Sequence, residues 1–454
     1  MREIRVQDTL TGRPAPLEPR EPGKAGIYVC GPTVYGRVHV GNARPFVVFA
    51  LYKRFLEHEG LDVTLVENVT DVNDKIYDAA RERGVESAAL AAEMTAAYVE
   101  DTDRLGLGRP DSEPKATETI GAIVDLIADL VESDHAYQAG GDVYFRVGSF
   151  PDYGKLSNRP LEEMQQGEGD DAAELKQSPQ DFALWKARKE GEDSWWESPW
   201  GEGRPGWHIE CSAMAEQILG LDFEIHGGGS DLVFPHHENE IAQTEAARER
   251  PLARIWMHNG MVEMGAEKMA KSVGNIRLLH GALDEFGRDA LVMYFVGGHY
   301  RQPLAVSERA LGDARRAVQR IADFCRRLDR SAGEPEGMDA YVGRFFDALA
   351  DDFNTPAARA VLFAWIAEGN RRADAGEALG PGRLGEMLTA IGMEHLLDDE
   401  SGGPPPEALE LAQQRDRARA ERDYAEADRI RDELAAMGWD ARDTPDGTRL
   451  VPSG

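Results

Sequence analysis

Cysteine and lysine are both scarce in this chain of 454 residues. The three cysteines, Cys30, Cys211 and Cys325, are too few for a disulfide framework and favour a reducing, cytoplasmic location. Lysine occurs at only ten positions. No run of eighteen apolar residues is present and the first residues do not resemble a signal peptide, so we expect no membrane association.

The shortage of basic residues leaves a formal net charge of −31. The acidic residues are spread along the chain instead of forming one tail. A surface of this kind repels nucleic acid at low ionic strength and resembles the surfaces of salt-adapted proteins. We therefore hypothesise a halophilic source, with an ordinary acidic cytosolic enzyme as the alternative. Activity measured across molar KCl separates the two.

The order of apolar segments predicts an α/β protein. We expect a Rossmann-like parallel-sheet catalytic domain with an inserted subdomain, followed by an α-helical bundle and a small C-terminal domain. The expected domain bounds are 1–111 with 201–304, then 112–200, 305–401 and 407–454. Strands are expected at 27–29, 62–67, 142–147, 223–225 and 254–258. Helices are expected from about 40 to 59, over 75–105, over 117–134, and from Trp207 and Thr355.

Several later segments carry structural signals. The acidic stretch Gln165–Glu174 is expected to be a mobile loop. Cys325 falls on the apolar side of a helical pattern and is best explained as a small core residue. Gly402–Pro406 indicates a linker before a helix at about 407–437, which is rich in arginine and glutamate, and a hairpin-like end follows at 443–448.

The stretch His226–Glu240 holds three glycines, an aspartate and several potential metal ligands. The glycines are expected to form a turn, and Pro235 suits the first turn of a helix because its φ is fixed and its missing N–H is not needed there. Such a helix places His236 and Glu240 on one face, where both can hold a divalent metal. The alternative is a polar helix start that merely carries two histidines. We favour the metal, because two distant cysteines also need a partner.

Two polar segments are candidates for binding phosphate. His39, Gly41 and Asn42 stand at an expected helix start, where the helix dipole attracts phosphate and glycine lets the backbone approach. Lys268 and Lys271 lie in a loop of small residues, and two such point charges suit a polyanion. Taken alone, each motif is also compatible with a solvated surface loop. Neither a dinucleotide fingerprint nor a P-loop is present.

Taken in chain order, His39-Val40-Gly41-Asn42 and Lys268-Met269-Ala270-Lys271-Ser272 resemble the HIGH and KMSKS elements of class I aminoacyl-tRNA synthetases. The segments 30–35, 207–212 and 227–240 are similar to those of the cysteinyl-tRNA synthetase family, and the resemblance covers essentially the whole chain. There are two departures. Asn42 replaces the second histidine of HIGH, and Ala270 replaces the first serine of KMSKS; neither change removes a charge that the chemistry needs.

The resemblance implies one zinc ion per chain, held by Cys30, Cys211, His236 and Glu240. Two thiolates, an imidazole and a carboxylate are ordinary zinc ligands. Cysteine and serine differ by one atom, which an apolar pocket exploits poorly, whereas a zinc ion with room for a further ligand prefers a thiolate to a hydroxyl. A separate editing domain is then unnecessary, and no segment resembles one.

The same resemblance assigns the other site residues. Thr70 and Trp207, together with Cys30, would line the pocket for L-cysteine. ATP, accompanied by Mg²⁺, would contact residues of three segments: His39, Gly41, Asn42, Gly228, Gly229, Asp231, Lys268 and Lys271. His39 and the two lysines would stabilise charge while the cysteine carboxylate attacks the α-phosphate, and tRNA(Cys) would then accept the cysteinyl group. A monomer is expected.

Two other functions share some of these motifs. A ligase joining activated cysteine to an amino-sugar would have the same active-site segments, but reading tRNA needs an anticodon-facing domain, and this chain continues past the helical bundle. The arginines of that region can equally pair with neighbouring acids. A non-catalytic structural zinc protein is disfavoured, because structural ligands tend to occur in closely spaced pairs and these span more than two hundred residues.

Overall fold

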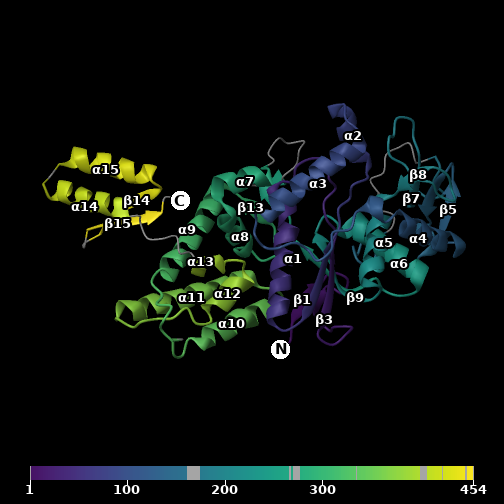
Figure 1. Cartoon of the computed structure of the whole chain (residues 1–454). Coiled ribbons are helices and arrows are strands. Elements are labelled where there is room, and N and C mark those ends of the chain that lie inside the picture. Colours follow the sequence, from purple (N-terminus) through teal and green to yellow (C-terminus); the bar gives the residue numbers. More distant parts are fainter. Residues whose placement is uncertain are drawn as a thin grey trace. The chain divides into compact units, whose positions relative to one another are not determined.

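The computed structural model describes residues 2–160, 174–264, 267–268, 277–333, 335–398, 406–421, 423–444 and 447–452. The chain divides into two compact units, Met1–Glu394 and His395–Gly454 (Figure 1). The second unit therefore begins at His395, before the small C-terminal domain expected from 407. Among the described residues, no helix has the length and apolar character needed to cross a membrane.

A four-stranded parallel sheet forms the centre of the first unit. Its spatial order is β10 (Ala253–Asn259), β9 (Phe223–Gly229), β3 (Lys24–Val29) and β4 (Asp62–Glu67). Ile27 on β3 pairs with Leu65 on β4 and with Ile225 on β9. Since the strands are parallel, the residues that follow each of them gather at one edge, where such folds bind ligands. The parallel-sheet prediction is confirmed.

The glycines 227–229 belong to strand β9 instead of forming the expected turn. Side chains alternate along a strand, so neighbouring glycines open space on opposite faces. A Cβ at Gly227 would lie 2.1 Å from the Phe49 ring on helix α1 (Val40–His58), and one at Gly228 would lie 3.0 Å from His237. The glycines therefore let a helix approach one face of the sheet and a histidine approach the other.

Helices cover both faces of this sheet (Figure 1). Helix α1 contacts β4, β9 and β10 on one face, and α5 (Trp207–Leu219) and α6 (Glu238–Arg248) share a buried apolar cluster with Tyr28 and Trp256 on the other. The helix expected over 75–105 is two helices, α2 (Asp74–Arg83) and α3 (Ser87–Asp103). Gly84 takes a left-handed φ of 66° and ends α2.

The expected insertion is an antiparallel sheet packed on one helix. Strands β5 (Ala136–Ala139), β6 (Asp142–Phe145), β7 (Phe182–Ala187) and β8 (Gly203–Pro205) pair in that order, and α4 (Ile120–Glu132) packs against them. The same buried cluster includes Ile209 of α5 and Ala242 of α6. The insertion therefore packs directly on the helices that carry site residues. Most of the acidic stretch 165–174 lies outside the described residues.

Helices dominate the rest of the first unit. Their bounds are α7 (Leu279–Phe286), α8 (Arg288–Val296), α9 (Glu308–Cys325), α10 (Asp339–Ala350), α11 (Thr355–Asp374) and α12 (Leu384–Ala390). Helix α11 begins at Thr355 as expected, with Asn354 accepting a hydrogen bond from Ala357 N. Cys325 is only half-buried, because Phe324 occupies the core position at the end of α9.

Two small strand groups complete the described part of the first unit. Strands β1 (Arg5–Asp8) and β2 (Arg13–Pro16) pair near the N-terminus. Strand β11 (Val262–Met264) lies between β12 (Glu267–Lys268) and β13 (Leu304–Val306). The group β12-β11-β13 carries Lys268, one of the two lysines expected to bind phosphate.

Over 407–437, where one helix was expected, the described residues form two helices. After the short α13 (His395–Asp398) come α14 (Pro406–Ala420) and α15 (Tyr424–Ala436), and Asp423 caps the start of α15. The expected hairpin is confirmed as β14 (Trp439–Thr444) and β15 (Gly447–Pro452). The helices and hairpin enclose a small core: Ala408, Leu411, Ile430 and Leu434.

Candidate active site

The four expected metal ligands come together at the edge of the central sheet. Cys30 follows β3, Cys211 lies on α5, and Glu240 lies in the first turn of α6. The ligand atoms of Cys30, Cys211, His236 and Glu240 all lie within 4.8 Å of one another, and all four residues are buried. Residues separated by more than two hundred positions thus form one cluster, as the sequence predicts.

Helix α6 begins at Glu238, and not at Pro235 as expected. Pro235 lies in the segment Val233–His237, which is kinked at Phe234, where the backbone is extended (φ −139°, ψ 132°), and which leads into α6. The predicted contact survives this difference: His236 Nε2 lies 3.1 Å from Glu240 Oε1. Glu240 Oε1 also lies 3.3 Å from Cys30 Sγ. A carboxylate oxygen is therefore placed between a thiol and an imidazole.

Burial determines the protonation of the cluster. It raises the pKa of the Cys30 and Cys211 thiols and of the Glu240 carboxyl, and it lowers the pKa of His236. All four groups are thereby biased toward their neutral forms. A bound divalent cation would favour the deprotonated thiols and carboxyl, so metal binding here should release protons.

A second donor set, which the sequence analysis missed, overlaps the first. It consists of Cys30, His226, His237 and Glu240. His226 Nε2 lies 3.5 Å from Cys30 Sγ and 3.2 Å from Glu240 Oε2. His226 Nδ1 and His237 Nε2 are buried, and neither has a hydrogen-bond partner within the described part of the chain. If residues 226–229 are taken as part of a strand, the alternation of side chains along it indicates His226 as a further candidate. The prediction of a glycine turn there does not include His226.

Two further histidines hold the imidazoles of the cluster. His208 Nδ1 lies 2.9 Å from His236 Nδ1, which leaves His236 Nε2 facing Glu240. His258 Nε2 lies 2.7 Å from His237 Nδ1. Burial lowers the pKa of both His208 and His258 to about 3, so both are neutral at neutral pH. These contacts fix ring orientation, as second partners of metal-binding histidines commonly do.

The insertion holds the start of helix α6, which carries Glu240, in place. The Glu238 carboxylate accepts backbone hydrogen bonds from Gly154 N, Leu156 N and Ser157 N at 3.0, 3.3 and 2.7 Å. Tyr153 also donates its hydroxyl to Asn239. Because Glu238 and Asn239 immediately precede Glu240, these bonds position the start of α6.

Thr70 and Trp207 flank the metal donors. The Trp207 ring stacks on His236 with centroids 4.4 Å apart. Thr70 is buried, and its hydroxyl accepts from Asn68 Nδ2 at 3.3 Å, while Asn68 Oδ1 lies 3.6 Å from Cys211 Sγ. The expected amino-acid pocket residues therefore border the cluster, Thr70 from the segment after β4 and Trp207 from the first residue of α5.

His39 and Asn42 form a reciprocal cap at the start of α1. His39 Nδ1 accepts from Asn42 N at 3.2 Å, and Asn42 Oδ1 accepts from His39 N at 3.1 Å. With Nδ1 accepting, the imidazole proton lies on Nε2. A Cβ at Gly41 would lie 2.9 Å from the His39 ring, so glycine is required there. Asn42 therefore has a capping role that a comparison with HIGH alone does not reveal.

The structure describes four of the remaining ATP candidates, which are Gly228, Gly229, Asp231 and Lys268. Gly228 and Gly229 end β9, and a Cβ at Gly229 would lie 2.5 Å from Asp231 Oδ1. Lys268 lies on β12, where it is paired with Glu263 of the antiparallel strand β11. Ala270 and Lys271 lie outside the described residues.

Comparison with known proteins agrees with this arrangement. Residues 16–316 match the model of the class I (C) tRNA synthetase catalytic domain. The chain is 45% identical to a cysteine–tRNA ligase of Halorhodospira halophila, covering 98% of this chain and 99% of the relative. The chain belongs to the cysteinyl-tRNA ligase family. It is 44% identical to the cysteine–tRNA ligase of Geobacillus thermodenitrificans, covering 99% of each chain.

The other matches fit a member of this family. Residues 344–392 match a DALR domain and residues 401–449 match a cysteinyl-tRNA ligase anticodon binding domain. A leucyl-tRNA synthetase from Agrobacterium radiobacter has a TM-score of 0.62 at 12% identity, covering 85% of each chain. A methionyl-tRNA synthetase from Mycobacterium tuberculosis has a TM-score of 0.60 at 15% identity, covering 82% of this chain and 88% of the other. These structures confirm the class I fold.

Proposed function

We propose that the protein is an ATP-dependent cysteine–tRNA ligase that forms cysteinyl-adenylate and transfers the cysteinyl group to tRNA(Cys). The observation that carries this proposal is the buried cluster of two thiols, an imidazole and a carboxylate at the ligand-binding edge of the sheet. Family membership supports it, because the relatives are named cysteine–tRNA ligases.

The cluster fits a zinc ion. Thiolate, imidazole and carboxylate are its usual ligands, and the donor atoms are already within 4.8 Å of one another. Of the two donor sets we favour the one with Cys211, because it offers a second soft thiolate and its His236 already directs Nε2 toward Glu240. A bound zinc ion would supply a soft Lewis-acid position that prefers a thiolate over a hydroxyl.

The chain's own residues would organise the first half-reaction. Thr70 and Trp207 would border the bound cysteine and direct its carboxylate toward ATP. That carboxylate attacks the α-phosphate, pyrophosphate leaves, and no protein nucleophile is needed. His39 Nε2–H and the N-terminus of α1 would stabilise charge on the phosphate.

Other groups would bind the rest of the nucleotide. Gly228, Gly229 and Asp231 would border the adenosine. Lys268 and Lys271 would neutralise the departing pyrophosphate, which Mg²⁺ accompanies. The unit from His395 onward would contact the tRNA, a role that an amino-sugar ligase does not require. We expect a cytoplasmic monomer, which light scattering on the purified protein can test.

Charging assays test this function directly. The purified protein should attach radiolabelled cysteine to a tRNA(Cys) transcript in an ATP-dependent reaction, and should not attach it to a transcript whose anticodon specifies another amino acid. Pyrophosphate exchange with cysteine but no charging, together with transfer to an amino-sugar, would instead identify the amino-sugar ligase. If neither pyrophosphate exchange nor tRNA charging is detected at high or low KCl, the proposal that the protein activates cysteine is wrong.

A further inference from the structure

Arg44, in the second turn of α1, has unusual surroundings for a charged side chain. It is 1% exposed, and its guanidinium group donates to four backbone carbonyls. Nη1 lies 2.7 Å from Gly260 O and 2.9 Å from Met261 O. Nη2 lies 2.7 Å from Gln302 O and 3.1 Å from His299 O. One side chain thus joins α1 to two chain segments that are distant in sequence.

No carboxylate of the described residues makes an ion pair with Arg44. Burial lowers its pKa to about 10, so the group remains charged at neutral pH. Burying a charge is costly unless hydrogen bonds compensate for lost water, and here carbonyl dipoles provide that compensation. A planar group with fixed donors can bridge two loops at once, which an ammonium group cannot do.

The two loops meet closely around this guanidinium group. Gly260 N donates to Tyr300 O at 2.7 Å, and Leu304 N donates to Met261 O at 2.9 Å. A Cβ at Gly260 would lie 2.4 Å from Gln302 O, so no larger residue fits between the loops. Arg44 therefore closes a junction in which backbone contacts tolerate little displacement.

Both loops lead into strands of the small sheet β12-β11-β13, in which β12 carries Lys268. Met261 precedes β11, and Gln302 precedes β13. Strand β11 pairs in parallel with β13 and antiparallel with β12, so Lys268 belongs to a sheet anchored at the Arg44 junction. On the other side of the junction, Ser230 N donates to Asn259 O at 2.8 Å, directly after the glycines of β9.

The start of α1 is tied to the far side of the lysine-bearing segment as well. Val40 N donates to Arg277 O, and Leu279 N donates to Val38 O, both at 3.0 Å. His39 and Leu278 form an antiparallel bridge. Gly260 and Met261 before the lysine-bearing segment are thus bonded to α1 through Arg44, and Arg277 and Leu279 after it are bonded to backbone groups next to His39.

We propose that Arg44 is a positioning residue for cysteine activation: it fixes the β11–β12 strand pair, and with it Lys268, relative to His39 at the start of α1. This inference rests on the proposed function. Arg44 touches no substrate in this account and acts through the strands. Its loss should affect the chemical step more than cysteine binding, because misplacing a charge-stabilising group by about 1 Å can cost roughly a hundredfold in rate.

The test compares two arginines that bind backbone carbonyls. Arg44→Lys keeps the positive charge but loses the planar guanidinium group whose N–H donors bind the four carbonyls. Arg288→Lys makes the same change where the guanidinium donates to Leu105 O at 2.7 Å and Gly392 O at 2.9 Å, away from β11. In ATP–pyrophosphate exchange, Arg44→Lys should lower kcat roughly ten- to hundredfold with an unchanged KM for cysteine and unchanged zinc content. Arg288→Lys should lose thermal stability but keep kcat.

A double-mutant cycle with Lys268→Ala separates positioning from general damage. If Arg44 acts through Lys268, adding Arg44→Lys to Lys268→Ala should cost little further rate; independent losses would multiply. If Arg44→Lys does not fold, Gly260→Ala displaces the same junction directly and should give the same kcat loss and the same non-additivity. Multiplying losses, or a normal kcat in Arg44→Lys, would overturn the proposal. A wild-type protein silent in exchange would instead overturn the proposed function.

Discussion

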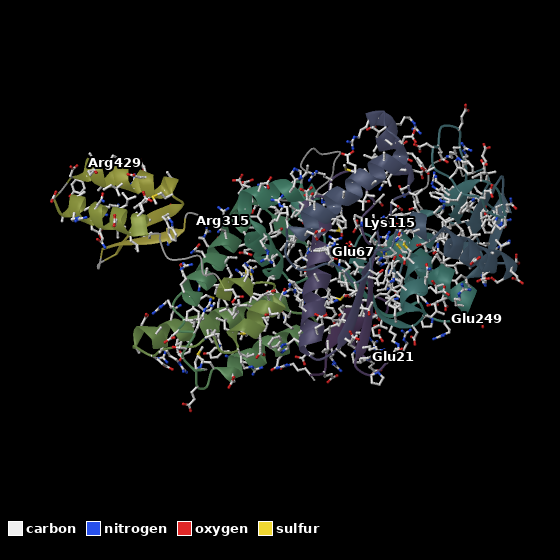
Figure 2. All side chains as sticks on the ribbon, viewed as in Figure 1. Glu21, Glu67, Lys115, Glu249, Arg315 and Arg429 are labelled. Atoms are coloured by element: carbon white, nitrogen blue, oxygen red, sulfur yellow. The ribbon has the colours of Figure 1, made fainter. Side chains whose placement is uncertain are left out.

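Glu67→Gln should remove a pH dependence of stability that burial of one carboxyl creates. Glu67 ends β4, is 4% exposed and is labelled in Figure 2. Burial raises its pKa from 4.5 to about 7, and the hydrogen bond from the Tyr98 hydroxyl at 2.5 Å offsets only part of that effect. The folded protein therefore retains a proton on Glu67 at a pH where the unfolded chain has released it.

The difference between the folded and unfolded pKa of Glu67 sets the sign and size of the pH dependence of stability. The stabilising contribution is fully present below pH 4.5 and is lost as the pH rises to about 7. Over this window the free energy of unfolding should fall by about 1.4 kcal/mol per pH unit, or about 3 kcal/mol in total. Glutamine has a similar shape and no titration, so the variant should lack this contribution to the slope.

Urea unfolding at constant salt, followed by tryptophan fluorescence from below pH 4.5 to above pH 7, measures the effect. The free energy of unfolding of Glu67→Gln, relative to wild type, should increase by about 3 kcal/mol across the window. Asp62→Asn removes an exposed carboxylate from the first position of the same strand and should leave the wild-type slope intact. A wild-type-to-Glu67→Gln difference that stays constant with pH would refute the reasoning.

Three further predictions concern the proposed reaction. Cys211→Ser should lower the zinc content and raise the KM for cysteine, while ATP binding is less affected. Cys325→Ser, at a half-buried position on α9, is the matched control. Full zinc content in Cys211→Ser would exclude Cys211 as a ligand. Lys271→Ala should slow exchange while cysteine affinity remains, because its charge is needed mainly as pyrophosphate departs; normal exchange kinetics would show that the lysine has no part in the reaction. Ending the chain at Glu394 should leave pyrophosphate exchange unchanged and raise the KM for tRNA in charging, because the residues proposed for the adenylate site all belong to the first unit. If the exchange rate and the charging rate fall equally, the second unit supports the fold instead.

Local patterns predicted the sheet and the pairing of His236 with Glu240 well, whereas the full donor set was implied by the family resemblance. The strand at 62–67 has the expected bounds, and Cys30, Cys211, His236 and Glu240 meet as the resemblance implies. Apolar periodicity and the spacing of ligand types are local properties of the sequence, and the parallel sheet then brings strand ends together without further information.

Interactions between distant segments could not be predicted in the same way. Glycines usually signal turns, but Gly227 and Gly228 lie in a strand because Phe49 and His237 need the space. The C-terminal arginines, which the sequence offers for tRNA contact, also form ion pairs within their own helix. Arg429, labelled in Figure 2, lies 2.7 Å from both Glu426 and Glu433. The sequence contains these acidic partners, but it does not distinguish their pairing with the arginines from contact of the arginines with tRNA.

The measurement that tests the central claim most directly is zinc-dependent discrimination between cysteine and serine. Purified protein should hold one zinc ion per chain, catalyse ATP–pyrophosphate exchange with cysteine and not with serine, lose that exchange on chelation, and regain it when zinc is restored. Equal exchange with both amino acids, or full cysteine exchange by protein stripped of metal, would contradict the account.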